Sequence, residues 1–262
     1  MPLTKFQAKI ARFLAENRSP DSYLAGGAAI HLEPRSQRFS NDLDYFHDSE
    51  ERVAEAFAAD KGELEGQGYQ LKVEMAQPGY IRSIVSSTEG QTKVEWSHDS
   101  SWRFLPTIKD SRVGFLLHPI NLALNKVLAL VGRDEPRDFL DTIQVHAQTL
   151  HLGALCWAAV GKDPGFSPSS LLELLKRRGK YRREDFSRLN LAVEINIFQL
   201  KQEWLQALDE ASAFVQSRPA HELGCLYYCP LRKTFVMPAK DSDEVILHYG
   251  CPGGVLPRVL DS

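Results

Sequence analysis

Two short stretches decide the fold: Tyr23-Leu24-Ala25-Gly26-Gly27 and, after twelve intervening residues, Ser40-Asn41-Asp42-Leu43-Asp44. In a β-strand, side chains two residues apart point to the same face. Asp42 and Asp44 are therefore predicted to project side by side from a strand over residues 42–47. Carboxylate oxygens are the hard ligands that Mg²⁺ prefers, so this strand predicts a site for one or two such ions.

A third carboxylate is expected from a neighbouring strand, and Glu95 is the best candidate. In the strand-like run 92–97, Lys93 and Glu95 share one face while Val94 and Trp96 share the other. Two metal ions about 4 Å apart can activate an attacking oxygen and stabilise a leaving oxygen in an in-line displacement. Asp42, Asp44 and Glu95 are thus the predicted catalytic and metal-ligating residues.

The residues around the acidic pair suit an anion. Gly26 and Gly27 allow the backbone to approach a phosphate closely, and a helix expected over residues 28–32 would direct its N–H groups there. Ser40 adds a hydroxyl. A D-x-D pattern alone is also compatible with a solvated strand face beside a turn. Its combination with the glycine pair and Ser40 favours a triphosphate-binding site.

These residues resemble the first motif of the DNA polymerase β-like nucleotidyltransferase superfamily, and more closely that of the AbiEii/AbiGii toxin family, where Gly-Gly precedes S-x-D-x-D. The family's second motif is a lysine-bearing helix, then an arginine, then R/K-D-x-x-D. It is matched by the helical stretch 118–130 with Lys126, by Arg133, and by Arg137-Asp138-Phe139-Leu140-Asp141. The chain departs from the family at Ala28, where a hydroxyl residue is common, and at Glu95, where aspartate is usual.

The second motif has its own physical logic. Lys126 and Arg133 lie seven residues apart on one helical face, so both can reach the same anion. A lysine point charge and an arginine fork are suitable partners for phosphates. Asp138 and Asp141 would either orient these cations or contact the nucleotide or acceptor. A surface helix carrying Arg–Asp pairs is the alternative interpretation.

The resemblance and the hydrophobic pattern predict one fold class: α/β (α+β), with a polymerase β-like palm and a mixed sheet in residues 1–117. A mainly helical domain with a small β-rich tail follows in residues 118–262. Helices are expected over residues 6–14, 28–32, 49–64, 119–133, 134–148, 152–160, 168–175 and 198–215. Strands are expected over residues 23–25, 42–47, 69–75, 80–85, 92–97, 225–228, 234–237 and 245–249.

The resemblance implies a Mg²⁺-dependent enzyme, with Mn²⁺ as the alternative ion, that moves a nucleoside monophosphate from an NTP to an acceptor. The acceptor implied by kinship is an RNA such as the 3′ end of a tRNA. The implied role is that of a toxin or phage-defence component with an antitoxin protein as partner. Two alternatives stay open: a nucleotide-binding regulator without turnover, and a transferase that modifies a protein or a small molecule.

One strongly basic run follows in the second half, and it is a weaker candidate for binding the acceptor. Its cations could track an RNA backbone, although such runs are often solvated helix ends. The net charge of −3 gives no general support for a nucleic-acid binder. The predicted acceptor-binding residues are Lys176, Arg177, Arg178, Lys180, Arg182 and Arg183.

The remaining composition favours a cytoplasmic protein with reduced thiols. The N-terminal residues lack the apolar core of a signal peptide, and the most apolar stretch, 113–131, is interrupted by polar residues and is not expected to cross a membrane. The four cysteines lack the spacing of a zinc site, which favours ordinary thiols.

Overall fold

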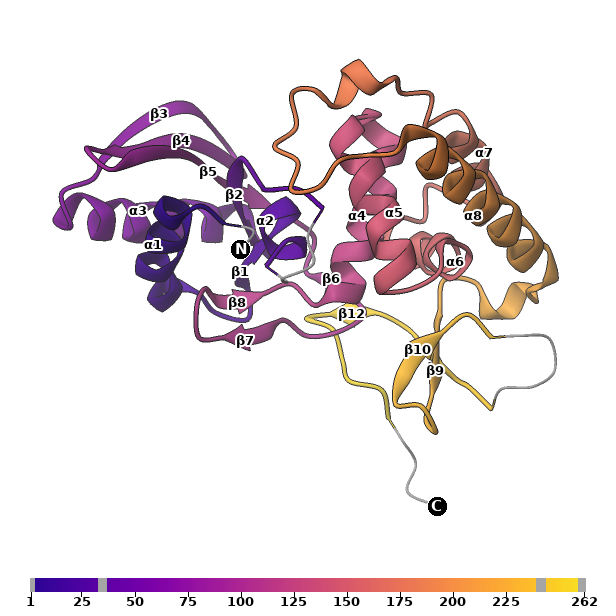
Figure 1. Cartoon of the computed structure of the whole chain (residues 1–262). Coiled ribbons are helices and arrows are strands. Elements are labelled where there is room, and N and C mark those ends of the chain that lie inside the picture. Colours follow the sequence, from indigo (N-terminus) through magenta and orange to yellow (C-terminus); the bar gives the residue numbers. More distant parts are fainter. Residues whose placement is uncertain (1–2, 33–36, 239–243, 259–262) are drawn as a thin grey trace. The chain divides into compact units, whose positions relative to one another are not determined.

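A computed structural model describes residues 3–32, 37–238 and 244–258 of the chain. They form two compact units, which can be followed by colour in Figure 1. Unit 1 comprises the described residues up to Ser101 together with Pro106–His118 and Asn190–Val193. Unit 2 comprises Trp102–Leu105, Pro119–Leu189 and the described residues from Glu194 onward. The chain passes from unit 1 to unit 2 after His118, one residue beyond the boundary expected from the sequence. Two short segments lie in the other unit: residues 102–105 in unit 2 and residues 190–193 in unit 1.

Unit 1 is built on a seven-stranded mixed sheet in the order β3-β4-β5-β2-β1-β8-β7. The pairs β2–β5 and β1–β8 are parallel and the remaining neighbours are antiparallel. Its strands are β1 (Ser22–Ala25), β2 (Asp42–His47), β3 (Gln70–Gln77), β4 (Tyr80–Ser87), β5 (Gly90–His98), β7 (Ile108–Asp110) and β8 (Gly114–Leu116). Its helices are α1 (Lys5–Leu14), α2 (Gly26–Ile30) and α3 (Glu50–Gly66), and a 3-10 turn spans Ala15–Asn17.

One face of this sheet carries the core of unit 1. Helices α1 and α3 both pack on β5 and on each other, and Leu43, Tyr45 and Trp96 are fully buried. The indole N–H of Trp96 donates to the Asp60 carboxylate of α3 at 2.7 Å. Side chains alternate between faces along a strand, so β2 and β5 present Asp42, Asp44 and Glu95 on the face opposite α3.

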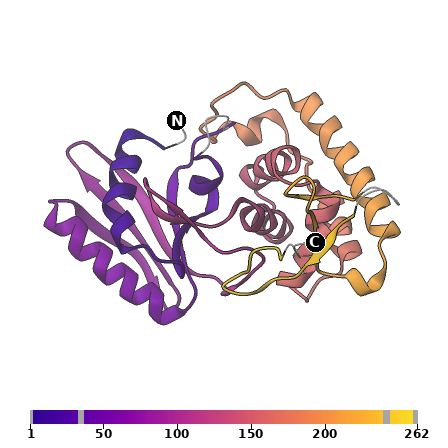
Figure 2. The same cartoon turned by 90° about the horizontal axis from the view of Figure 1, so that it is seen from below.

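Unit 2 is mainly helical, and α6 forms its centre. Nine consecutive residues of α6 are buried, as expected of a helix that is apolar on all sides. The amphipathic α8 lies along one side of the bundle (Figure 1, Figure 2) and packs on α6 and α7. The helices are α4 (Pro119–Arg133), α5 (Pro136–Gln148), α6 (Leu152–Lys162), α7 (Pro168–Lys176) and α8 (Ile197–Ser217), with 3-10 turns at Arg183–Phe186 and Ala220–Glu222.

Two small sheets complete unit 2. The first has the order β10-β9-β11 and the second pairs β12 with β6. Their strands are β6 (Trp102–Arg103), β9 (Leu226–Cys229), β10 (Thr234–Val236), β11 (Ile246–His248) and β12 (Cys251–Pro252). The β12–β6 pair places the C-terminal strand beside Trp102 and Arg103, which explains why the segment 102–105 belongs to unit 2.

The mixed sheet, the helical half and the β-rich tail confirm the predicted fold class. Two predicted helix starts were wrong. The helix expected over 28–32 begins at Gly26, because Gly26 adopts a φ of +59° and turns the chain directly out of β1. The helix expected over 134–148 begins at Pro136, because Asp134 has a φ of +46°, outside the helical region. Within the described ranges, no helix combines the length and apolarity needed to span a bilayer.

Candidate active site

The parallel pairing of β2 with β5 brings the three predicted carboxylates together. Asp42 lies opposite Lys93 and Asp44 opposite Glu95 in the register. Each of Asp42, Asp44 and Glu95 offers one oxygen, and these oxygens lie within 4.8 Å of one another. Three hard oxygen donors at this spacing fit a divalent ion such as Mg²⁺ or Mn²⁺. We refer to these residues as the carboxylate triad.

Lys93 and Arg82 pair with carboxylates of the triad. The Lys93 ammonium lies 2.9 Å from Asp42 Oδ2 and 2.9 Å from Glu95 Oε1, and the Arg82 guanidinium lies 3.0 Å from Glu95 Oε1. Burial alone would lower the pKa of Lys93, but the neighbouring carboxylates outweigh burial and raise it. Lys93 is therefore a charged ammonium that bridges two of the three predicted ligands.

The glycine pair adjoins the triad from β1 and α2. A Cβ on Gly26 would lie 1.9 Å from the Asp44 carboxylate, so no other residue fits without moving Asp44. A Cβ on Gly27 would lie 2.8 Å from Arg38 Nη2 and 3.1 Å from Ser40 Oγ. The Ser40 hydroxyl in turn donates to Asp42 Oδ1 at 3.0 Å. The structure thus brings all six predicted residues of unit 1 to one corner of the sheet.

The predicted residues of the second motif form a separate cluster inside unit 2. The Lys126 ammonium lies 3.1 Å from Asp138 and 2.9 Å from Asp141. Arg133 donates to both oxygens of Asp138, with Nη2 to Oδ1 at 2.9 Å. Both aspartates are fully buried, whereas 49% of the Arg133 side chain is exposed. We call Lys126, Arg133, Asp138 and Asp141 the buried ion cluster.

Electrostatics favour the charged form of Asp138 in the buried ion cluster. Burial alone would raise the pKa of Asp138, but hydrogen bonds and charge from Arg133 and Lys126 outweigh burial and lower it. Asp138 contacts both cations and Asp141 contacts Lys126, an arrangement that favours the orienting role among the two that the sequence left open. The binding of a nucleotide by Lys126 and Arg133 stays a prediction.

The basic run is largely engaged in contacts within unit 2. Lys176 pairs with Glu173 at 2.7 Å, Arg178 with Asp134 at 3.0 Å, and Arg183 with Glu194 at 2.9 Å. The Tyr181 ring packs on Phe139 and Phe186, so it is occupied by neighbouring side chains. Arg177, Lys180, Arg182 and Arg183 are exposed, and their role in binding an acceptor stays a prediction.

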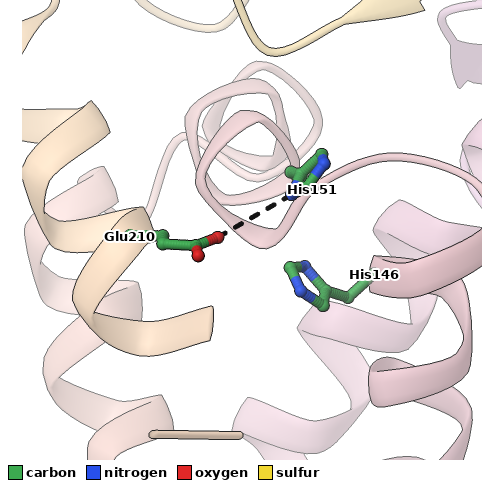
Figure 3. A group of neighbouring side chains, drawn as sticks. All are labelled: His146, His151 and Glu210. Atoms are coloured by element: carbon green, nitrogen blue, oxygen red, sulfur yellow. Dashed lines mark ion pairs between the residues drawn. The ribbon is translucent and has the colours of Figure 1, made fainter. Parts of the chain in front are cut away.

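A second group of ligand-type side chains, His146, His151 and Glu210, occurs on unit 2. These side chains project toward one another from α5, from the start of α6 and from α8 (Figure 3), and His151 lies 4.0 Å from Glu210. His146 Nδ1 accepts a hydrogen bond from the backbone N–H of Leu152 at 2.9 Å. Burial is the main cause that lowers the pKa of His146, so the ring is neutral and carries its proton on Nε2. Neither ring nitrogen then has a lone pair for a metal, and His146 serves to satisfy the first N–H of α6.

The cysteines behave as the sequence predicts for ordinary thiols. All four are free, and Cys156, Cys225 and Cys229 are buried. Burial raises the pKa of Cys156 to about 12 and that of Cys225 to about 11. Within the described part of the chain, the groups with metal-ligand geometry contain no cysteine.

Three cations near the triad were missed by the sequence analysis. Lys93 was recognised as a neighbour of Glu95 but given no role, and Arg38 and Arg82 were not considered. Arg38 is buried beside Gly27, and Arg82 faces Glu95 because β4 pairs with β5 in that register. The signal available for Lys93 was its two-residue spacing from Glu95. Arg82 required knowledge of the strand register.

Comparison with known proteins supports the fold. No protein-family model and no curated protein matches the chain. Among solved structures, MenT4, a nucleotidyltransferase toxin from Mycobacterium tuberculosis, is similar at a TM-score of 0.51 and 17% identity, over 82% of this chain and 83% of that one. JHP933 from Helicobacter pylori is similar at a TM-score of 0.49 and 15% identity, over 82% of this chain and 95% of that one. The likeness to MenT4 shows that this chain has the nucleotidyltransferase fold.

Proposed function

We propose that this protein is a divalent-metal-dependent nucleotidyltransferase that moves a nucleoside monophosphate from an NTP to an acceptor. The observation that carries the proposal is the carboxylate triad. Asp42, Asp44 and Glu95 converge from two parallel strands of a nucleotidyltransferase-type sheet, on the face opposite α3. Oxygen donors grouped at this spacing are the ligand set that a divalent ion such as Mg²⁺ prefers.

Each residue of this corner has a proposed part. The triad would hold the ion, which when bound polarises phosphate oxygens and neutralises charge in the transition state. Gly26 and Gly27 keep side chains away from the approaching phosphates, and Ser40 fixes Asp42 through its hydrogen bond. The acceptor oxygen attacks the α-phosphorus while the bond to the β-phosphate oxygen breaks, and pyrophosphate leaves. Positioning and charge neutralisation supply most of the rate enhancement in such transfers.

The buried ion cluster has a proposed supporting part. Arg133 is half exposed and is held in a fixed orientation by Asp138. A guanidinium presented in this way is suited to a phosphate group. We propose that Arg133 makes this contact and that Lys126 holds Asp138 and Asp141 in place through its ion pairs.

The acceptor and the biological setting are proposed on kinship. MenT4 is named a nucleotidyltransferase toxin, and the sequence motifs resemble those of a toxin family. We propose an RNA acceptor such as a tRNA 3′ end, an antitoxin protein as partner, and a cytoplasmic location. The exposed cations Arg177, Lys180 and Arg182 of the basic run are the proposed contacts to that RNA.

Incorporation of an α-phosphate label tests the proposal. Each of the four NTPs would be incubated with Mg²⁺, the protein, and either total RNA or a protein extract, beside an Asp44→Asn control of nearly identical shape. We expect label to appear on RNA with at least one NTP and to disappear in the control. Label on protein or on a small molecule would retain the transferase and change the acceptor. If the protein binds an NTP but transfers no label under any of these conditions, the proposed enzymatic activity is wrong and a nucleotide-binding regulator takes its place.

A further inference from the structure

The ammonium of Lys93 occupies a position inside the carboxylate triad. It contacts Asp42 Oδ2 and Glu95 Oε1, each at 2.9 Å, and the register places Lys93 directly opposite Asp42. Asp42 and Glu95 contribute two of the three oxygens that lie within 4.8 Å of one another. The side chain of Lys93 thus supplies a positive charge where a metal ion held by these carboxylates would supply it.

The second cation at the triad has a different geometry. Arg82 contacts Glu95 at 3.0 Å and is itself 35% exposed. Among the described residues, Lys93 pairs with both Asp42 and Glu95, whereas Arg82 pairs with Glu95. Because Lys93 joins two predicted ligands and Arg82 joins one, removal of Lys93 changes the charge between the ligands far more than removal of Arg82.

Lys93 also has the freedom to leave. Its side chain is 28% exposed, and a lysine ammonium is a single hydrated charge on a flexible four-carbon stem. Lys126 differs because its side chain is only 6% exposed and its partners Asp138 and Asp141 are fully buried. An ammonium at the edge of solvent can exchange carboxylates for water, whereas one that is enclosed cannot do so cheaply.

We propose that Lys93 is a tethered counter-ion of the carboxylate triad, which a divalent cation must displace in order to bind, so that Lys93 sets the metal affinity of the site. This inference rests on the proposed function, because it assumes that the triad is the metal site. Lys93 is a positioning residue in this scheme. Without metal it holds Asp42 and Glu95 together through its two ion pairs, and it opposes metal binding because two positive charges beside the same carboxylates repel each other.

The test is a titration with Mn²⁺ alone, followed by the electron paramagnetic resonance signal of the free ion. The proteins compared are wild type, Lys93→Met, and Arg82→Met as the matched control that removes one cation from the edge of the triad. We expect Lys93→Met to bind Mn²⁺ at least about tenfold more tightly than wild type, because a unit charge beside the ligands is gone. Arg82→Met should change the affinity by a smaller factor.

A second readout separates this effect from loss of fold. Thermal melting without metal should show Lys93→Met to be less stable than wild type, and added Mn²⁺ should raise its melting temperature by more than it raises that of wild type. If Lys93→Met does not fold, Lys93→Gln, which removes the charge but keeps a hydrogen-bond donor, takes its place.

The outcomes that overturn the inference are distinct from those that overturn the proposed function. If wild type binds Mn²⁺ in a manner that Asp44→Asn abolishes, and folded Lys93→Met binds no more tightly, the role of Lys93 is wrong and the metal site stands. If neither wild type nor Lys93→Met binds Mn²⁺, the metal site fails, and the proposed function and this inference fail together.

Discussion

The carboxylate triad of unit 1 and the two aspartates of the buried ion cluster in unit 2 each pair with a lysine and an arginine, but they differ in their exposure to solvent. Beside the triad, Lys93 is 28% exposed and pairs with Asp42 and Glu95, whose side chains are 9% and 15% exposed. In the cluster, Lys126 is 6% exposed and its two aspartates are fully buried. The two lysines therefore differ in their access to water. Lys93 can exchange its carboxylate partners for water, whereas Lys126 is held by its buried partners.

The comparison shows why similar sequence patterns carry different functions. A buried charge without its partner costs much more than an exposed one, so the cluster must stay intact for unit 2 to fold. The triad tolerates a change of counter-ion because water can solvate the ammonium group of Lys93 once it is displaced. We therefore assign the exchange of cations to Lys93 of unit 1, and mainly an orienting role to Lys126 of unit 2.

The largest expected effect comes from making the same substitution in both regions. Lys126→Met would leave Asp138 and Asp141 buried without their shared cation, and breaking a buried pair costs about 3–5 kcal/mol of unfolding free energy. Lys93→Met should cost about 1 kcal/mol or less in the absence of metal, because partly exposed pairs contribute little. Urea denaturation followed by circular dichroism measures both values. Equal losses of unfolding free energy in Lys126→Met and Lys93→Met would contradict the distinction between the two regions.

The next effect concerns activity at the triad. Loss of a residue that hydrogen-bonds to a metal ligand lowers metal affinity or activity by about 10- to 100-fold. Asp44→Asn alters a proposed ligand itself, so it should lower the rate of nucleotidyl transfer by more than about 100-fold. The free energy of unfolding should change little, because Asp44 is only partly buried. Initial rates of label transfer, compared with urea denaturation of the same samples, measure the two quantities. A loss of rate matched by a loss of folded protein would contradict the assignment.

A moderate effect is expected at the glycine that adjoins the triad. In Gly26→Ala, the left-handed backbone at a φ of +59° costs about 1–2 kcal/mol for a residue with a Cβ. The new Cβ would also meet the Asp44 carboxylate, so Mn²⁺ binding should weaken along with stability. Calorimetric titration and thermal melting measure the two effects. Gly62→Ala is the matched control, since a Cβ there meets nothing within 4 Å.

The smallest effect is a pH dependence of stability that comes from Asp138 in the cluster. The folded-state pKa of Asp138 lies below its ordinary value of 3.8. Its ionisation therefore contributes stability that is fully present above pH 3.8 and is lost as pH falls through the lower, folded pKa. The difference in unfolding free energy between wild type and Asp138→Asn should be constant near neutrality and shrink below pH 3.8. A difference that is the same from pH 7 to pH 2 would contradict the lowered pKa.

Much of the fold was predictable because local signals agreed with the tertiary structure. The spacing of Asp42 and Asp44 and the alternation around Glu95 gave the strands that carry the triad, and their parallel pairing brought the predicted ligands together. Ser49 and Ser167 begin α3 and α7 through side-chain caps. The short strands β6, β7, β8 and β12 were missed, because two or three residues carry no periodic signal and their pairing is set by distant partners.

The grouping of the three carboxylates was predictable from the sequence, but the cations around them were not. The positions of Arg82 and Arg38 depend on strand register and on the close approach of Gly27, and a single sequence contains neither. Whether Lys126 faces a ligand or a pair of buried aspartates depends on how α4 packs on α5. The helical spacing that suggested a phosphate contact for Lys126 serves equally well for the ion pairs that the structure contains.

The most direct test of the central claim is to locate a bound ion. Crystals of the wild-type protein would be soaked in Mn²⁺ and a non-hydrolysable NTP, and anomalous scattering would be recorded near the manganese edge. We predict an anomalous peak among the carboxylate oxygens of Asp42, Asp44 and Glu95, with the Lys93 ammonium moved away from Asp42. A peak at His146, His151 and Glu210 with none at the triad, or an ordered nucleotide without any ion between it and Asp44, would contradict it.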